Sequence, residues 1–141
     1  MATTYLHRVV PALEDGTLSP EGLDLLERAF ESLALRRVVE ASENLAEVVE
    51  RWPRYAPAQL LLAEGLRNRQ MYDRCHDRLR QAEKQIPDDI NIRLQRIRCG
   101  LLRYGAASKN AKPLIEELER IVEEDSDNIL AHKILNALDT K

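Results

Sequence analysis

The sequence is poor in the residues that build β-rich or disulfide-stapled proteins. Aromatic residues make up 4% of the 141 residues, and there are five glycines, six prolines and two cysteines. Cys75 and Cys99 fall inside helical patterns, without the paired spacings of a zinc site or a disulfide framework. We therefore expect a reducing compartment, with Cys75 acting as a small packing residue.

The chain also has no long hydrophobic run. Residues 1–16 have no basic start followed by an apolar stretch, so the pattern predicts neither a signal peptide nor a membrane span. A soluble, cytoplasmic protein is the expectation.

The abundant residues of the chain are aliphatic or charged. Hydrophobic residues make up 44% and charged residues 32% of the chain, which is typical of a helical protein rich in Leu, Ala, Arg and Glu. The length suits one domain with a sustained core.

The clearest pattern is a helical hairpin over residues 55–87, closed by Pro87. Its apolar positions have helical spacing in two runs: Leu60, Leu62, Ala63 and Leu66, then Tyr72, Cys75, Leu79 and Ala82. Another proline, Pro53, closes an equivalent stretch earlier in the chain. The sequence therefore predicts a helical repeat whose period is the separation of these two prolines.

Shifting the chain by this separation places Ala41 over Cys75, Leu45 over Leu79 and Val48 over Ala82. The period of about 34 residues and these small or aliphatic positions resemble the tetratricopeptide repeat family. Leu62 and Ala63 stand for that family's Leu-Gly pair, whereas Arg28 and Ser32 in the first repeat depart from its pattern.

The resemblance implies an all-α fold, a right-handed stack of antiparallel helical hairpins. The expected parts are an N-terminal cap over 1–18, repeats over 19–53, 54–87 and 88–126, and a closing helix over 127–141. The apolar phase breaks between Leu33 and Val38, which favours two helices over one long helix within 20–52 and leaves both open. The third repeat is irregular because its loop at 105–112 is about five residues longer than the period predicts.

Members of the family generally hold a peptide or a partner helix on a concave face lined by the first helix of each repeat. The resemblance implies a non-catalytic adaptor, assembly factor or secretion-type chaperone that binds a protein partner. The implied partner-binding residues are Leu23, Leu26, Phe30, Leu33, Leu60, Glu64, Arg67, Asn68, Arg96 and Arg98. The family's clamp for a terminal carboxylate is absent, because Leu26 and Phe30 occupy its positions.

Two other functions stay open. Residues 67–112 carry twelve Lys and Arg against five acidic residues, between two acidic segments, so the basic helix over 93–112 is a candidate nucleic-acid surface. The simpler interpretation is that oppositely charged repeats attract each other. The first repeat is apolar around most of its helix, which also allows self-association, with residues 5–13 as its alternative cover.

No catalytic or cofactor site is predicted. The histidines, His7, His76 and His132, fall in separate elements without metal-ligand spacing, and the glycines are scattered singly. We expect neither an enzyme nor a bound metal.

Overall fold

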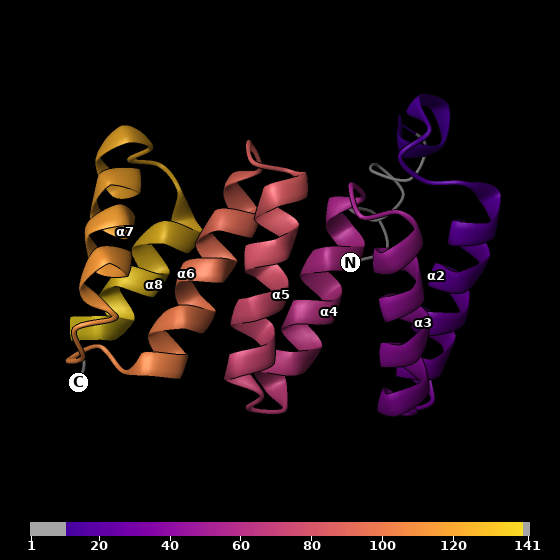
Figure 1. The fold of residues 1–141 in the computed structure, drawn as a ribbon, viewed down its shortest axis with the longest axis horizontal. Helices are drawn as coiled ribbons and strands as arrows, with labels where there is room; N and C mark the ends of the chain where they lie inside the picture. The colour runs from indigo at the N-terminus through magenta and orange to yellow at the C-terminus, as the bar shows by residue number, and fades with distance from the viewer. Residues whose placement is uncertain (1–10, 140–141) are drawn as a thin grey trace.

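The computed structural model describes residues 11–139, which are helices joined by short turns, with no strand among them (Figure 1). Residues 11–15 are helical. The helices that follow are α2 (Pro20–Ala34), α3 (Val38–Arg51), α4 (Ala56–Asn68), α5 (Tyr72–Gln85), α6 (Ile90–Tyr104), α7 (Lys112–Glu124) and α8 (Ile129–Asp139). None of the described helices is long and apolar enough to cross a membrane.

Residues 20–52 form two helices, as the break in apolar phase favoured. The turn between them holds Arg36 at a φ of 59°, and the equivalent turn one repeat later holds Gln70 at a φ of 61°. A left-handed residue reverses the chain within a short turn, which few non-glycine residues do without strain. The helix-ending residues also match: Trp52 lies at φ −131°, ψ 67° and Ile86 at φ −134°, ψ 68°. The repeat seen in the sequence is therefore present in the backbone.

The third hairpin has the same design with a longer loop. Its second helix ends at Asp125 with φ −131° and ψ 74°, close to the values at Ile86. Asp125 lies about five positions later than the period places the counterpart of Ile86. Gly105 ends α6 at a φ of 83°, a conformation that suits glycine, and Ala111 at the end of the loop is fully buried in the C-terminal part of the core. The extra residues therefore lengthen the loop between α6 and α7, and the chain returns to the core at Ala111.

Repeated positions share the same burial. The second helices of the three hairpins bury equivalent residues: Ala41, Cys75 and Leu114; Leu45, Leu79 and Leu118; Val48, Ala82 and Ile121. Each helix carries these residues at i, i+4 and i+7, which is one face of an α-helix. The buried core therefore runs along the whole row of helices.

The beginning of the described chain covers one end of this row. Ala12 and Leu18 are buried against the first hairpin. A Cβ atom on Gly22 would lie 2.5 Å from Leu18 Cδ1 and 3.1 Å from the Trp52 ring, so a larger residue here would have to displace these side chains. Residues 11–15 thus supply part of the expected cover for the first repeat, and the rest of that predicted cap, from residue 10 back, lies outside the described residues.

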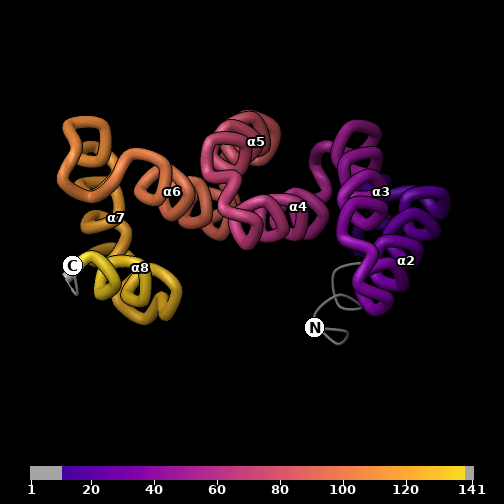
Figure 2. Tube along the Cα trace, turned by 90° about the horizontal axis from the view of Figure 1, so that it is seen from below, coloured from indigo at the N-terminus to yellow at the C-terminus, as the bar shows by residue number. Residues whose placement is uncertain are grey.

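The helices form a curved row in chain order (Figure 2). Consecutive helices from α2 to α8 contact each other, and α6 contacts both α4 and α8. Figure 2 shows α5 on the outer side of the row, with α4 and α6 on the opposite side. The core divides within α6, whose Ile92 and Cys99 belong to the N-terminal cluster and whose Leu94 and Ile97 belong to the C-terminal cluster.

Candidate functional site

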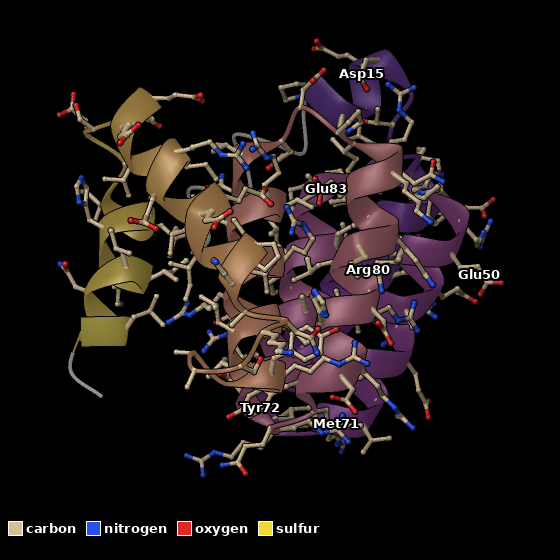
Figure 3. All side chains as sticks on the ribbon, turned by 60° about the vertical axis from the view of Figure 1, so that its left-hand side comes forward. Asp15, Glu50, Met71, Tyr72, Arg80 and Glu83 are labelled. Atoms are coloured by element: carbon tan, nitrogen blue, oxygen red, sulfur yellow. A yellow bond between two sulfur atoms is a disulfide. The ribbon has the colours of Figure 1, made fainter. Side chains whose placement is uncertain are left out.

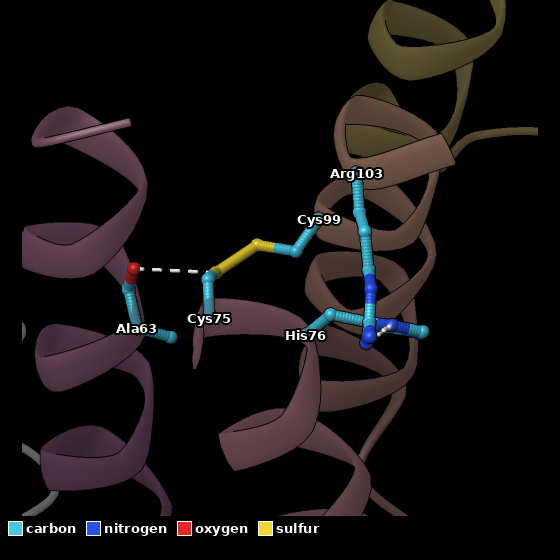
Figure 4. The surroundings of a disulfide bond; sticks show 5 residues. All are labelled: Ala63, Cys75, His76, Cys99 and Arg103. Atoms are coloured by element: carbon cyan, nitrogen blue, oxygen red, sulfur yellow. Dashed lines mark hydrogen bonds between the residues drawn. A yellow bond between two sulfur atoms is a disulfide. The ribbon is translucent and has the colours of Figure 1, made fainter. Parts of the chain in front are cut away.

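The contact between α5 and α6 contains a disulfide that the sequence analysis did not expect. Cys75 of α5 and Cys99 of α6 are bonded, with their Cα atoms 6.0 Å apart, and both are buried (Figure 4). The Cys75 sulfur also lies 3.4 Å from the carbonyl oxygen of Ala63 on α4. The expectation of unpaired cysteines was wrong, because α5 and α6 place these two residues, which are distant in sequence, on facing surfaces.

A polar cluster lies beside this disulfide. Arg103 Nη1 lies 3.0 Å from Asp77 Oδ1 and 3.3 Å from His76 Nδ1, and Arg103 Nε lies 3.4 Å from Asp73 Oδ1. The His76 ring is buried and packs edge-on against Tyr104, with 5.6 Å between ring centroids. Burial and the nearby Arg103 guanidinium lower the pKa of His76, because both disfavour the imidazolium. The cluster therefore fixes α6 against α5 with a neutral histidine.

The guanidinium of Arg96 is engaged by carboxylates of its own chain. Its guanidinium forms ion pairs with Glu83 of α5 and Glu117 of α7, and Arg93 lies 3.5 Å from the same Glu117 carboxylate. The Arg96 side chain is 12% exposed. Its role in partner binding stays a prediction, and a partner would have to compete with these two carboxylates for the guanidinium. These pairs support the simpler interpretation of the charge pattern, in which neighbouring repeats attract each other.

The predicted anchors on α2 divide into buried and exposed residues. Leu26 is completely buried and therefore cannot contact a partner, so that prediction was wrong. Leu23 and Phe30 are half-buried and pack against the core, whereas Leu33 is 39% exposed. Their exposure differs because α3 and residues 12–18 both pack against α2 and cover parts of its surface.

On α4 and α6 the structure brings three predicted residues together. Glu64, Arg67 and Arg98 interact electrostatically, and the pKa of the Arg98 guanidinium is lowered by burial first and by the Arg67 charge second. Asn68 is exposed at the end of α4, and Leu60 is half-buried against the core. The charged group of the predicted concave face is therefore a real cluster, although nothing in its chemistry singles out a ligand.

The largest exposed aliphatic group lies at the tip of the first hairpin, where α2 turns into α3. We call it the aliphatic tip, and it consists of Leu33 (39% exposed), Leu35 (56%), Val38 (41%) and Val39 (63%). The equivalent residues one repeat later, at the tip of the second hairpin, are Arg67, Arg69, Tyr72 and Asp73. The two tips make the same turn, so the turn itself does not require aliphatic residues.

Sequence reasoning found only Leu33 of this group as a binding residue. Leu35 belongs to the apolar surface of the first repeat that needs cover, Val38 belongs to the apolar stripe of the following helix, and the pattern did not single out Val39. The signal that identifies them is the repeat alignment, because it shows which aliphatic residues have no aliphatic counterpart at the equivalent position of the next repeat.

A groove begins at this tip and runs between α3 and α5. Its first part has a volume of about 660 Å³. It is lined by Val39, Ser42, Glu43 and Ala46 of α3, Leu62 and Leu66 of α4, Arg69 just after α4, and Arg74, Asp77, Arg78 and Gln81 of α5. A second part of about 510 Å³ continues to Pro53 and Gln85. Figure 3 shows α5 from Tyr72 at its lower end to Glu83 in its upper half.

No metal-binding group of His, Cys, Asp and Glu is present in the part of the chain that the structure describes. Comparisons with known protein families, with curated proteins and with solved structures return no match for this chain.

Proposed function

We propose that this chain is a tetratricopeptide-like repeat protein that serves as a non-catalytic protein-interaction module, an adaptor, assembly factor or secretion-type chaperone. The aliphatic tip is the observation that carries the proposal. Its four large aliphatic side chains are exposed together at a turn where the second hairpin has no aliphatic residue at the equivalent positions. The fold does not require aliphatic side chains at this turn, so their presence points to another role.

In the isolated chain these side chains are exposed to water, and a complex that buries them would gain free energy. Burying a Leu or Val side chain contributes roughly 1.5–3 kcal/mol, and contiguous exposed apolar residues on a stable protein typically mark an interaction site. A partner that covers Leu35 and Val39 would recover this free energy. The cluster formed by Glu64, Arg67 and Arg98 remains a second candidate contact on the predicted concave face.

Nucleic-acid binding is less well supported, because the arginines of α6 are largely paired within the chain. Arg93, Arg96 and Arg103 all form ion pairs with carboxylates of α5 or α7. A phosphate backbone would have to compete with those carboxylates. Self-association through the first repeat draws on the same aliphatic tip, so the experiment must separate it from partner binding.

A cytoplasmic location remains a prediction. Unpaired cysteines no longer support it, because Cys75 and Cys99 form a disulfide and disulfides persist mainly in oxidising compartments.

The test is a pull-down from native lysate with three baits: the wild-type chain, Leu35→Glu plus Val39→Glu, and Ile129→Glu. Ile129 is 83% exposed on α8, so its variant places a charge on another exposed aliphatic position as a matched control. Helical circular dichroism of all three baits checks that each is folded. Because the substituted side chains are exposed, we expect unchanged helicity.

The expected result is a protein that the wild type and Ile129→Glu recover and the tip variant loses. Recovery of the same proteins by all three baits would contradict the proposal. Recovery of further copies of the chain alone would assign the tip to self-association, and recovery of nucleic acid alone would return the argument to the basic surface. Phe30→Asp is a poorer variant, because Phe30 packs against the core.

A further inference from the structure

The groove between α3 and α5 has regular walls over its whole length. The α5 wall carries Arg74, Arg78, Gln81 and Gln85, at i, i+4, i+7 and i+11, which is one continuous stripe of a helix. Asp77 also lines this wall, but its carboxylate already forms ion pairs with Arg80 and Arg103. The α3 wall runs from Val39 to Pro53, or about 21 Å at 1.5 Å per residue. The groove is therefore long enough for about six residues of an extended chain.

The floor of the groove is aliphatic. Leu62 and Leu66 of α4 form it, with Ala46 of α3 beside them, and Val39 of the aliphatic tip stands at its open end. A ligand that enters the groove from the tip therefore meets the exposed Val39 first and then the small exposed parts of Leu62 and Leu66, which are 5% and 9% exposed. That surface favours aliphatic side chains in the occupant.

The charges of the groove differ between its walls. Arg69, Arg74 and Arg78 are exposed along the α4–α5 side, and none of them forms an ion pair with any residue in the described range 11–139. On the opposite side of α5, by contrast, Arg96 and Arg103 of α6 form ion pairs with Glu83 and Asp77 of α5. Glu43 and Glu50 on the α3 wall are exposed and also lack an ion pair within that range.

We propose that this groove binds an acidic, aliphatic peptide segment of a partner protein, with its carboxylates against Arg69, Arg74 and Arg78 and its aliphatic side chains on the Leu62–Leu66 floor. This inference rests on the proposed interaction function and names the occupant of its site. Carboxylates pair with guanidinium groups through two parallel hydrogen bonds, which gives direction as well as attraction. Glu43 on the facing wall repels carboxylates, so the segment binds with its acidic edge toward α5.

The test is a selection of random peptides displayed on phage against the immobilised, disulfide-intact chain. We expect the selected peptides to be enriched in Asp or Glu together with Leu, Ile or Val. Arg74→Glu plus Arg78→Glu is the test variant, and Arg28→Glu plus Arg120→Glu is the matched control, because Arg28 and Arg120 are exposed elsewhere and the change in charge is the same.

A selected peptide carrying a fluorescent label then gives the affinity by anisotropy. We expect the test variant to bind at least about tenfold more weakly and the control to bind as the wild type does. Binding should also weaken as salt rises. Glu43→Gln should bind about twofold more tightly, because it removes the repulsion from the α3 wall.

Selected peptides without acidic residues, or equal binding by the test variant and the wild type, would overturn the proposal. Binding of poly(U) RNA that the test variant loses would overturn it too, because the arginines would then serve a nucleic acid. If selection yields no peptide while the tip variant still loses a protein in the pull-down, the groove proposal fails and the interaction function stands. If the pull-down yields no tip-dependent protein while acidic peptides are selected, the tip is wrong and the groove stands.

Discussion

Helix α5 faces α6 on one side and α3 on the other, and the two sides differ in almost every respect. Toward α6 it contributes Cys75 to a disulfide and packs His76 and Glu83 against arginines of α6. Toward α3 it presents Arg74 and Arg78 across an open groove, and no ion pair or disulfide joins α3 to α5 within the described residues. One helix thus has a closed side and an open side.

The difference shows how the two kinds of charge on α5 are used. On the closed side, opposite charges and the disulfide join the second and third hairpins, so their polar groups satisfy each other. On the open side, Arg74 and Arg78 form no ion pair with any of the described residues, which leaves them available to a ligand. Substitutions on one side at a time therefore test what each side contributes.

The largest effect is expected from breaking the disulfide. Cys75→Ser plus Cys99→Ser should lower the free energy of unfolding by about 3 kcal/mol, because the unfolded chain regains the freedom of the loop that the bond closes. Chemical denaturation followed by helical circular dichroism measures this. The wild type unfolded in excess reductant should match the variant.

Equal stability of the wild type and the double variant, with and without reductant, would show that the closed side does not depend on the bond. Peptide binding in the α3–α5 groove, measured below the unfolding transition, should not change in either case. That second measurement tests whether the two sides of α5 are independent.

The sequence predicts the repeated part of this fold better than the contacts between repeats. The hairpin over 55–87, the turn between Leu33 and Val38 and the longer loop before α7 all follow from local periodicity and from the offset between the two prolines. The burial of Ala41 and Cys75, which that offset places at equivalent positions, confirms it for the first two hairpins. Such features depend on residues close in sequence, so a single chain reveals them.

Contacts between helices that are distant in sequence could not be predicted in this way. The facing positions of Cys75 and Cys99 depend on the rotation of α6 against α5, which periodicity does not specify. Leu26 was assigned to a binding face and lies in the core, because residues 12–18 and α3 cover more of α2 than the repeat pattern indicates. The groove arginines were missed because basic residues were sought on α6, where the chain neutralises them.

A smaller effect is expected from acid, through His76 on the closed side. The pKa of His76 is lowered in the folded chain, by burial first and by Arg103 next, so the unfolded chain takes up a proton at a higher pH than the folded chain does. The free energy of unfolding should therefore fall as pH decreases through about 6.5, the usual pKa of histidine. His76→Gln should remove this part of the pH dependence.

The measurement is chemical denaturation at a series of pH values from neutral to mildly acidic, for the wild type, His76→Gln and His132→Gln. Subtracting the His76→Gln curve from that of the wild type removes the carboxylates common to both. His132 lies on α8, away from the closed side, so its variant should keep the wild-type slope. A slope that disappears in His132→Gln and persists in His76→Gln would refute the assignment.

The smallest effect is expected at the open end of the groove. Val39→Ala should change the free energy of unfolding by less than about 0.5 kcal/mol, because Val39 is 63% exposed and packs little against its own chain. Val48→Ala on the same helix should cost about 2 kcal/mol, because Val48 is completely buried and its loss leaves a cavity. Denaturation curves of the two variants give both values. Since both substitutions remove the same two methyl groups from α3, similar losses would mean that Val39 supports the fold, and the aliphatic tip would no longer be available as a contact for a partner.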